Sequence, residues 1–429
     1  MTNEKYDTLR IHAGYRPEAH QYASSVPIYE TAAFVLGDAK SAEDIVNGRS
    51  KGRYSYSRVG NPTVKVFEER IAVLEGGIGA VAVGSGMSAI TYTILNVAEG
   101  GGRIIAPTNI YGAGLDEFRT LLPKFNINFD LYDQVNDLQT VKNLIKKDTK
   151  AIYVESVANP STEIADIEAL AKIAHEANIP LIVDNTFPTS YLFRPFEFGA
   201  DITVYSSTKG INGHGNEISG LIVDRGQFDW GNGKFPQFEE DEFVLGNEEL
   251  NEKSSFVEKF GKQAFIARIR TKYLRLFGSV LSPFDAYLAL IGLETISERL
   301  DKEVKSATKI AHYLSNNSNV KHVYYSGSDL SNKLAEKYFP KGIGSILAFE
   351  IAGTDQQVNQ LLDAVRVFSY LPNIGDSKSL IVNPVKTTHR EIPGEIRKTQ
   401  GLNSHVIRLS IGLEDIDDLD QAINQAFSN

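Results

Sequence analysis

A lysine stands among small residues in the stretch "SSTKGINGHG", which runs from Ser206 to Gly215. Three hydroxyl residues precede Lys209 and three glycines follow it, and the apolar residues before them are typical of the end of a strand. A solvated surface lysine needs no such neighbours. One interpretation is a lysine that caps a loop or pairs with an acid. The other is a desolvated amine that forms a Schiff base with an aldehyde.

A carboxylate ends a second apolar stretch, "PLIVDNT", where Asp184 comes at the carboxyl end of an expected buried strand. In parallel sheets, ligands bind outside the carboxyl ends of the strands. Asp184 is therefore either a cap for the turn that follows or a contact for a ligand.

A glycine turn, "GSGMSA" from Gly84 to Ala89, lies between an expected strand and an expected helix. Backbone N–H groups at such a helix start bind anions such as phosphate. The spacing also fits the dinucleotide fingerprint, which requires an acidic residue at the end of the next strand. That strand, "RIIAP", ends without one, so an NAD-dependent oxidoreductase is disfavoured. A tight turn with no ligand is the other alternative.

These three features together meet the needs of one cofactor, pyridoxal 5'-phosphate (PLP). Its phosphate needs N–H donors, its ring nitrogen needs a carboxylate and its aldehyde needs a lysine amine. Hydroxyls of Ser206 and Thr208 can add donors for the phosphate or support the ring. The glycines after Lys209 let the backbone come close to the cofactor. The sequence therefore predicts a PLP site.

The elements that must position this site alternate between strand and helix. Helices are expected from Ser88 to Val97 and from Asp166 to Ala177. The expected strands are "AVAV", "RIIAP", "NINFDLYD", "KAIYVES", "PLIVDNT", "DITVYSS" and "GLIVD". Such alternation predicts an α/β fold whose mostly parallel sheet is covered by helices on both faces.

The flanking regions have a different character. Residues 1 to about 60 are expected to form an irregular arm, and residues 226–280 to form an insertion or long loop. Helices and strands after Ser282 indicate an α+β domain. We therefore expect an arm (1–62), a PLP-binding domain (63–280) and a C-terminal domain (281–429).

Composition narrows the choice of partners. The chain has 429 residues, a formal net charge of -10, a pI near 5.4 and no cysteine. An acidic balance disfavours nucleic acid and anionic membranes. The lack of cysteine removes disulfides and thiolate metal sites, we expect no metal, and the composition fits a reducing cytoplasm. The N-terminal residues show no secretory signal, and the uncharged run from Ala80 to Ala98 is too polar for a membrane span.

At this point the chain resembles a known family over essentially its whole length. The motifs that carry the resemblance are "YSRVGNPT", "GSGMSAI", "NIYGA", "ESVANP", "DNTF", "YSSTKGINGHG", "SKSLIVNP", "TTH" and "VIRLSIGLE". The family is the Cys/Met-metabolism family of fold-type I PLP enzymes. The resemblance implies an aminotransferase-like large domain with a mostly parallel seven-stranded sheet, and a smaller α+β C-terminal domain.

The resemblance also implies roles for single residues. Lys209 would hold the cofactor and transfer protons, Asp184 would pair with the ring nitrogen, and Tyr111 would stack on the ring and assist the chemistry. The phosphate would be bound by Gly86, Met87, Ser206 and Thr208, with Tyr56 and Arg58 added from the neighbouring subunit. The amino-acid end of the substrate would be bound by Asn159, Ser379 and Arg408. An obligatory dimer follows, and a homotetramer is favoured.

Each of these residues also has a structural alternative. Tyr56 is an edge-strand aromatic, Arg58 a surface charge and Tyr111 a loop packing residue in that interpretation. Asn159 is then a turn former before Pro160. Arg408 would lie on the exposed face of an alternating strand.

The reaction is implied by the resemblance alone. The length and the insertion at 226–280 are similar to the sulfhydrylase branch of the family. This branch replaces acetate in O-acetyl-L-homoserine by sulfide, giving L-homocysteine in methionine and cysteine biosynthesis. Cystathionine γ-synthase, methionine or cystathionine γ-lyase and a non-catalytic PLP or interaction protein are the alternatives. Asn383 and Lys386 depart from the pattern expected of the branch, which leaves the acyl group and the sulfur donor open.

Overall fold

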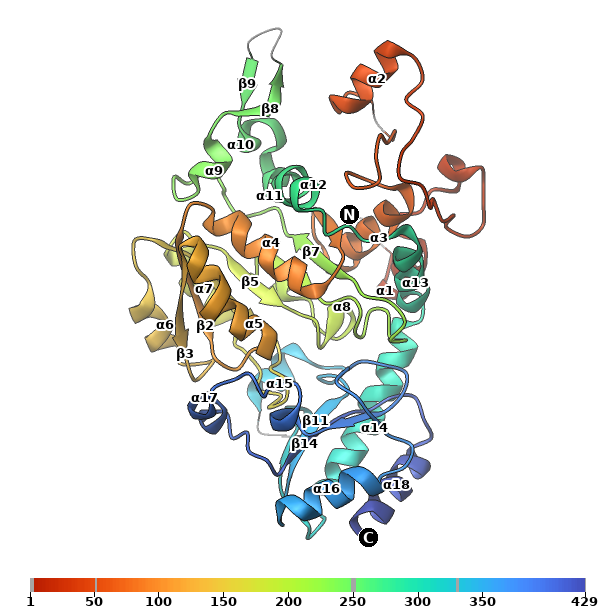
Figure 1. The fold of residues 1–429 in the computed structure, drawn as a ribbon, viewed down its shortest axis with the longest axis vertical. Coiled ribbons are helices and arrows are strands. Elements are labelled where there is room, and N and C mark those ends of the chain that lie inside the picture. The colour runs from red at the N-terminus through yellow and green to blue at the C-terminus, as the bar shows by residue number, and fades with distance from the viewer. Residues whose placement is uncertain (1–3, 51, 248–251, 329–331, 429) are drawn as a thin grey trace. The chain divides into compact units, whose positions relative to one another are not determined.

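The computed structural model describes residues 4–50, 52–247, 252–328 and 332–428, and Figure 1 traces their helices and strands. They form two compact units. The first unit consists of Met1–Val97, Val204–Thr208 and Asn216–Glu294. The second unit consists of Ala98–Thr203, Lys209–Gly215 and Thr295–Asn429. The chain passes from the first unit to the second after Val97, after Thr208 and after Glu294.

Seven strands form one mixed sheet in the order β1-β7-β6-β5-β4-β2-β3. They are β1 (Gly79–Val83), β2 (Gly102–Pro107), β3 (Ile127–Tyr132), β4 (Thr149–Glu155), β5 (Leu181–Asp184), β6 (Ile202–Tyr205) and β7 (Gly220–Asp224). β1 pairs with β7 antiparallel, whereas β2, β3, β4 and β5 pair with one another in parallel. Except in the edge strand β3, the strands are mostly buried, which is typical of a sheet covered on both faces. The prediction of a mostly parallel seven-stranded sheet is confirmed.

In the first unit, α3 (Pro62–Glu75) shows how the sequence sets a helix. Asn61 accepts a hydrogen bond from the N–H of Thr63, Pro62 opens the first turn, and Gly76 ends the helix at φ 79°. The arm before α3 is more regular than expected. It contains two helices, α1 (Tyr6–His12) and α2 (Ala39–Val46). Asp38 caps α2 by accepting the N–H of Ser41.

The interruption after β7 is folded and not a long loop. Its elements are α9 (Pro236–Glu239), β8 (Glu242–Asn247), β9 (Glu252–Ser254), α10 (Phe256–Phe260), α11 (Ala264–Arg268) and α12 (Arg275–Phe277). Trp230 stacks on Phe238 and Phe265, with ring centroids 4.7 and 4.8 Å apart. This aromatic packing supplies a core that periodicity alone did not reveal. α13 (Pro283–Leu293) follows, with Ser282 as its cap.

The second unit places helices between its parallel strands. After β2 come α5 (Gly112–Asp116), a π-helical turn over Glu117–Leu121 and a 3₁₀ turn. α6 (Leu138–Leu144) precedes β4, α7 (Ile167–Glu176) precedes β5, and α8 (Thr189–Leu192) precedes β6. α7 begins one residue after its expected start, because Asp166 is the cap of the helix and accepts the N–H of Ala169.

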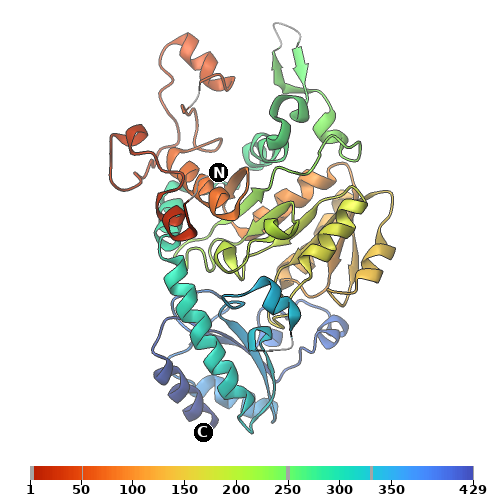
Figure 2. The same cartoon turned by 180° about the vertical axis from the view of Figure 1, so that it is seen from behind.

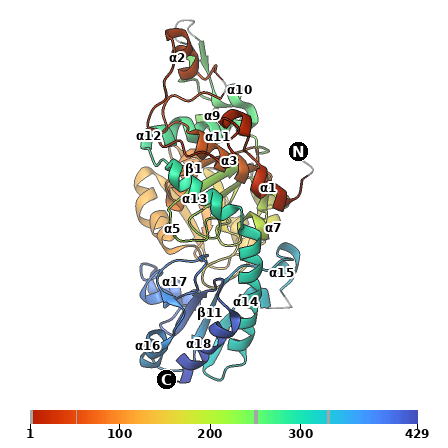
Figure 3. The same ribbon diagram turned by 90° about the vertical axis from the view of Figure 1, so that its right-hand side faces the viewer.

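A five-stranded sheet, β10-β11-β14-β13-β12, forms the C-terminal part of the second unit. Its strands are β10 (Val320–Tyr324), β11 (Ile346–Ile351), β12 (Ser369–Tyr370), β13 (Leu380–Val382) and β14 (Val406–Ser410). The helices of this part are α14 (Ile296–Ser315), α15 (Lys333–Tyr338), α16 (Asp355–Ala364), α17 (Gly394–Thr399) and α18 (Ile416–Ser428). The long helix α14 packs on β10 and β11, and Figure 2 shows it along this sheet. α18 contacts both α14 and α16 (Figure 3).

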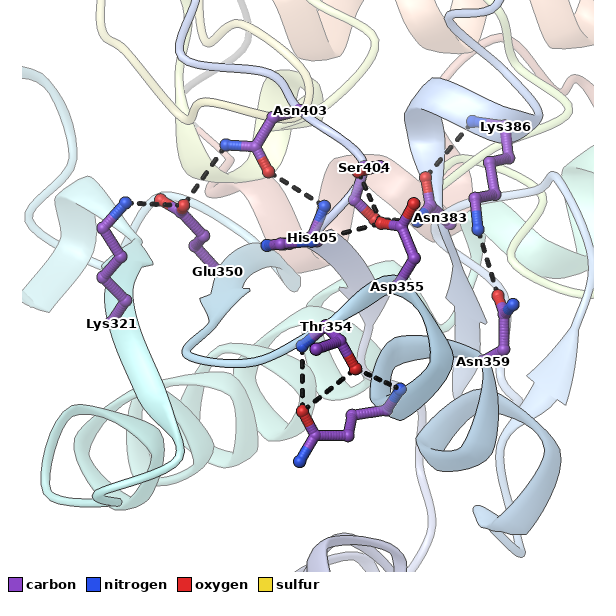
Figure 4. A network of polar contacts seen from close by, with 11 residues as sticks. Lys321, Glu350, Thr354, Asp355, Asn359, Asn383, Lys386, Asn403, Ser404 and His405 are labelled. Atoms are coloured by element: carbon purple, nitrogen blue, oxygen red, sulfur yellow. Dashed lines mark hydrogen bonds and ion pairs between the residues drawn. The ribbon is translucent and has the colours of Figure 1, made fainter.

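A polar network fastens the segment after β13 to this C-terminal part (Figure 4). The side chain of Asn383 donates to the carbonyl of Ser404 at 2.7 Å and accepts the N–H of Lys386. The ammonium of Lys386 donates to Asn359 on α16 at 3.0 Å. Asn383 and Lys386 therefore hold the backbone that leads to His389. In the described part of the chain, no helix is long and apolar enough to cross a membrane.

Candidate active site

The residues expected to form the site divide between the two units. The first unit holds Tyr56, Arg58, Gly86, Met87, Ser206 and Thr208. The second unit holds Tyr111, Asn159, Asp184, Lys209, Ser379 and Arg408. Each group is built by different elements.

In the first unit, the turn between β1 and α4 (Gly86–Ala98) has the form of an anion cradle. The first N–H groups of α4, at Gly86 and Met87, precede the first hydrogen bond of the helix and have no carbonyl partner within it. A Cβ on Gly86 would lie 2.6 Å from the Cβ of Ser206. A Cβ on Gly220 would lie 2.1 Å from the carbonyl oxygen of Ser85. Only glycine allows this close approach, so the turn brings N–H groups next to Ser206.

Thr208 has a clear structural task. Its hydroxyl accepts the N–H of Ser219 at 2.9 Å and donates to the carbonyl of Ser219 at 3.2 Å. Ser207 and Ser219 also share a hydrogen bond between their hydroxyls at 2.5 Å. The stretch before Lys209 is thereby tied to the residue that precedes β7.

Tyr56 and Arg58 lie on the surface of the first unit. Tyr56 is 43% exposed, and the guanidinium of Arg58 lies over its ring at 5.3 Å from the centroid. Arg58 also donates to the carbonyl of Arg275. A cation and a phenol are thus held side by side and open to solvent.

In the second unit, Lys209 is largely buried and its amine donates to Oδ1 of Asn373 at 2.5 Å. Burial lowers the pKa of Lys209 to about 8. The positive charge of Arg408 contributes to this shift and Asp376 opposes it. A lysine with such a pKa is partly neutral near pH 7 to 8 and can act as a nucleophile or base.

The loop that follows Lys209 is clamped by Arg299 of α14. Arg299 donates to the carbonyls of Gly210 and Ile211 at 3.0 and 3.1 Å. At Gly213, with φ 72°, a Cβ would lie 1.9 Å from the guanidinium of Arg299. The glycines after Lys209 therefore make room for a protein side chain, which is a use that the sequence analysis did not foresee.

Arg408 on β14 is only 3% exposed. It donates to the carbonyl of Asn373 at 3.0 Å and to Oδ1 of Asn159 at 3.4 Å. Its Nε has no hydrogen-bond partner among the described residues. Burial lowers the pKa of Arg408 to about 10. A buried guanidinium with an unpaired N–H is a receptor for an anion such as a carboxylate, and the alternative of an exposed strand face is wrong.

Asn159 is held from its other side by His389. The Nε2 of His389 lies 3.0 Å from the carbonyl of Asn159, and its Nδ1 lies 2.8 Å from the hydroxyl of Thr388. Burial lowers the pKa of His389 to about 4, and the charge of Arg408 adds to this effect. A neutral His389 therefore fixes the turn that carries Asn159 without adding a second cation.

Ser379 belongs to a different set of hydrogen bonds from the one that joins Lys209 and Arg408 to Asn373. It is fully buried, its hydroxyl donates to Glu414 at 2.7 Å, and it accepts the N–H of Gly412 at 2.8 Å. Asn373, six residues earlier, is the residue of this loop that contacts both Lys209 and Arg408. Asn373 was not among the expected site residues, because an asparagine after Pro372 and two residues before Gly375 is also typical of a turn.

Asp184 ends β5 as expected. Its Oδ1 accepts the N–H of Thr186 at 3.0 Å, and its Oδ2 accepts the hydroxyl of Tyr153 at 3.2 Å. Burial raises the pKa of Asp184, and these hydrogen bonds oppose that shift. Neither Tyr153 nor its neighbour Glu155 was among the expected site residues. The signal was present, because Glu155 also ends a parallel strand, β4.

Tyr111 precedes α5 and is 44% exposed. Its N–H donates to Oε1 of Glu155 at 2.6 Å. A Cβ on Gly112 would lie 2.8 Å from the carbonyl of Thr388. Tyr111 is thus held at its backbone from two sides while its ring stays accessible.

Each unit holds groups that fit a part of PLP. The close contacts at Gly86 leave no space for a side chain at the start of α4, and N–H groups at a helix N-terminus bind phosphate. The second unit supplies an amine of lowered pKa, a carboxylate that accepts two protein hydrogen bonds, and a buried guanidinium with an unpaired N–H. An amino acid bound to this cofactor presents the carboxylate that such a guanidinium requires.

Comparison with known proteins agrees with this fit. The family model for "Cys/Met metabolism PLP-dependent enzyme" matches residues 7–428. The protein named Sulfhydrylase FUB7 from Fusarium oxysporum f. sp. lycopersici is 38% identical, over 99% of this chain and 97% of its own. The O-acetyl-L-homoserine sulfhydrylase of Leptospira meyeri is 37% identical, over 100% of this chain and 97% of its own.

A solved structure resembles the whole chain. It is a putative O-acetylhomoserine (thiol)-lyase from Campylobacter jejuni with a pyridoxyl-lysine-phosphate residue. It is 33% identical, covers 99% of this chain and 100% of its own, and gives a TM-score of 0.93. The fold and site thus define a fold-type I PLP enzyme. The chain belongs to the Cys/Met metabolism family of PLP-dependent enzymes.

Proposed function

We propose that the protein replaces the acetate group of O-acetyl-L-homoserine by sulfide, giving L-homocysteine and acetate, in methionine and cysteine biosynthesis. The observation that carries this proposal is the pair formed by Lys209 and Arg408. An amine of lowered pKa and a buried guanidinium with an unpaired N–H both contact Asn373. This pair suits an α-amino acid whose α-carbon loses a proton. Full-length relatives named sulfhydrylases support the particular reaction.

The chemistry requires no net oxidation. The bond between Cγ and the ester oxygen breaks and its electron pair leaves with acetate, while a pair from sulfide forms the new bond at Cγ. PLP, when bound, supplies an electron-withdrawing ring that accepts the negative charge left at Cα. The neutral amine of Lys209 accepts the proton from Cα and later returns a proton to the product. Between these steps Asn373 holds the Lys209 amine through its Oδ1.

The other residues bind and orient. We propose that Arg408 and Asn159 hold the α-carboxylate, and that Gly86, Met87, Ser206 and Thr208 hold the phosphate. Asp184 pairs with the ring nitrogen and Tyr111 stacks on the ring. Ser379 is proposed to act on substrate only through its loop, since Glu414 engages its hydroxyl.

The assembly is part of the proposal. The exposed pair Tyr56 and Arg58 suits a site in a neighbouring copy, because two copies exchange such residues across a two-fold axis. We therefore propose an obligatory dimer, with a homotetramer as the favoured assembly, and the division into an arm and two domains. A cytoplasmic location is proposed from the lack of cysteine.

The reaction is tested by analysing the products of the holoenzyme with O-acetyl-L-homoserine and sulfide. Homocysteine and acetate are expected in equal amounts. Parallel assays use O-succinylhomoserine, cysteine in place of sulfide, and methionine or cystathionine alone. Release of 2-oxobutyrate and ammonia as the main products would overturn the proposal in favour of a γ-lyase. Cystathionine formed faster than homocysteine would favour a γ-synthase.

A further inference from the structure

Two carboxyl groups end neighbouring strands in the second unit. Glu155 and Asp184 are register partners at the last positions of β4 and β5. Parallel neighbours lie about 4.8 Å apart, and residues in register point to the same face of the sheet. Tyr153, two residues before Glu155, points to that face as well, since its hydroxyl reaches Asp184. The two acids therefore share one small environment.

Both groups are partly withdrawn from solvent, so two negative charges at this distance repel each other strongly. Burial raises the pKa of Glu155 well above its usual range, and the charge of Asp184 adds to this shift. Burial raises the pKa of the Tyr153 hydroxyl well above its usual range, and the negative charges of Asp184, Glu155 and Glu117 add to this shift. One carboxyl of such a pair keeps a proton at neutral pH.

Each carboxyl accepts two hydrogen bonds, so the proposed pairing of Asp184 with the ring nitrogen, and not the bonds themselves, selects Glu155 as the protonated group. Asp184 accepts the hydroxyl of Tyr153 and the N–H of Thr186, and both stabilise a negative charge. Glu155 accepts the N–H of Tyr111 at 2.6 Å and a second main-chain N–H from Asn159. The carbonyl oxygen of a neutral carboxyl group can still accept such a bond. A neutral Glu155 therefore leaves the contacts to Tyr111 and Asn159 possible.

We propose that Glu155 is a neutral positioning residue, which holds the backbone of Tyr111 and Asn159 and leaves Asp184 as the only carboxylate of the pair. This rests on the proposed function only through the roles given to Tyr111, Asn159 and Asp184. A single charge at Asp184 matches a single protonated ring nitrogen. A second charge at Glu155 would disturb that balance.

The direct test is infrared difference spectroscopy of the substrate-free holoenzyme against Glu155→Gln at neutral pH. Loss of a protonated-carboxyl C=O stretch is expected in the variant. A difference that contains only carboxylate bands would overturn the proposal. Because no substrate is present, this result is independent of which thiol or ester the enzyme uses.

Activity gives a second test with a matched set of variants. Glu155→Gln keeps an oxygen acceptor without a charge, so its kcat/KM and PLP affinity are expected to stay within about threefold of wild type. Glu155→Leu leaves the N–H of Tyr111 unpaired and is expected to lose about tenfold or more in kcat/KM. The exposed Glu336→Gln serves as the surface control. A loss in Glu155→Gln as large as that in Glu155→Leu would contradict a neutral Glu155.

Discussion

At the scale of single residues, the proposed function depends on how buried charged groups shift the pKa values of their neighbours. Lys209 and Arg408 both contact Asn373 in the second unit. Burial lowers the pKa of Lys209 to about 8, and the nearby guanidinium contributes. The Nε of this guanidinium has no hydrogen-bond partner in the described part of the chain. In the proposed function, Arg408 therefore both binds the substrate carboxylate and helps to lower the pKa of the Lys209 amine.

This coupling makes a prediction about cofactor uptake. Only the neutral amine attacks the aldehyde of PLP, so the rate of PLP uptake by apoenzyme should rise with pH and level off above a midpoint near 8. In Arg408→Gln the positive neighbour is lost, the pKa of Lys209 rises, and the midpoint should move to higher pH. The measurement is the rise of the PLP–lysine absorbance in stopped-flow mixing.

The control for that experiment is Lys321→Ala, which removes a cation that lies on the surface at β10. Its uptake profile should match wild type. An Arg408→Gln midpoint that is unchanged or lower would show that the guanidinium does not set the protonation of Lys209.

At the scale of elements, helix starts and strand ends do the positioning. α4 begins at Gly86 against Ser206, β4 and β5 end at two acids, and α14 carries Arg299 to the loop after Lys209. These are the places where backbone groups are unpaired or side chains converge.

The start of α4 predicts the effect of a single methyl group. Gly86→Ala places a Cβ 2.6 Å from Ser206, so the turn must shift, at a cost of about 1–3 kcal/mol. PLP affinity should therefore fall about tenfold. The matched control is Gly114→Ala, where no atom lies within 4 Å of the new Cβ. Fluorescence titration with PLP measures both. Equal affinities for the two variants would contradict a tight cradle at Gly86.

A buried acid on α14, Glu303, leads us to expect that the stability of the fold depends on pH. Glu303 is fully buried, both its oxygens lack a hydrogen bond of good geometry among the described residues, and burial raises its pKa to about 8. A carboxyl with a raised pKa binds its proton more tightly when folded. Its contribution to stability is therefore present below about pH 4.5 and is lost as pH rises toward 8.

The variant Glu303→Gln has no proton to lose at this position, so it should keep its stability as pH rises toward 8. Its Tm should exceed that of wild type at pH 8, with a difference in unfolding free energy of roughly 1–4 kcal/mol, and should approach wild type near pH 5. The exposed Glu336→Gln should track wild type at both values. A lower Tm for Glu303→Gln at pH 8 would show that the ionised carboxylate is stabilising.

At the scale of the whole molecule, the proposed function requires residues from two copies. Tyr56 and Arg58 lie exposed on the arm side of the first unit, in keeping with a role in a neighbouring copy. If this is so, Lys209→Ala and Arg58→Ala subunits should complement each other, because a mixed dimer holds one complete site.

Random mixing of the two inactive variants should restore about one quarter of wild-type activity, since half of the dimers are mixed and each has one intact site. The measurement is activity after the two variants are unfolded and refolded together, with each variant refolded alone as control. Recovery no greater than the sum of the two controls would mean that Arg58 acts within its own subunit.

Much of the fold and of the candidate site could be predicted from the sequence, because both depend on local patterns. Lys209, Asp184 and the turn at Gly86 stand at strand ends and a helix start, where local pattern and chemistry coincide. The seven strands followed from apolar runs between turn signals. The family, the fold class and the cofactor predicted from these motifs are confirmed by the family model and the solved relative.

Other features depended on long-range contacts that no local pattern carries. The aromatic core around Trp230 orders a segment that was expected to be a loop. Asn373, which contacts Lys209, was not expected at the site, and the hydroxyl of Ser379, expected to bind substrate, donates to Glu414. The helices of the arm were missed because α1 and α2 are short and polar.

The central claim is that Lys209 is the residue that carries the cofactor. The most direct measurement is borohydride reduction of the holoenzyme, followed by peptide mapping by mass spectrometry. We expect a phosphopyridoxyl group on Lys209 alone, with the visible absorbance band lost on reduction. A phosphopyridoxyl group on another lysine, with Lys209 unmodified, would contradict it.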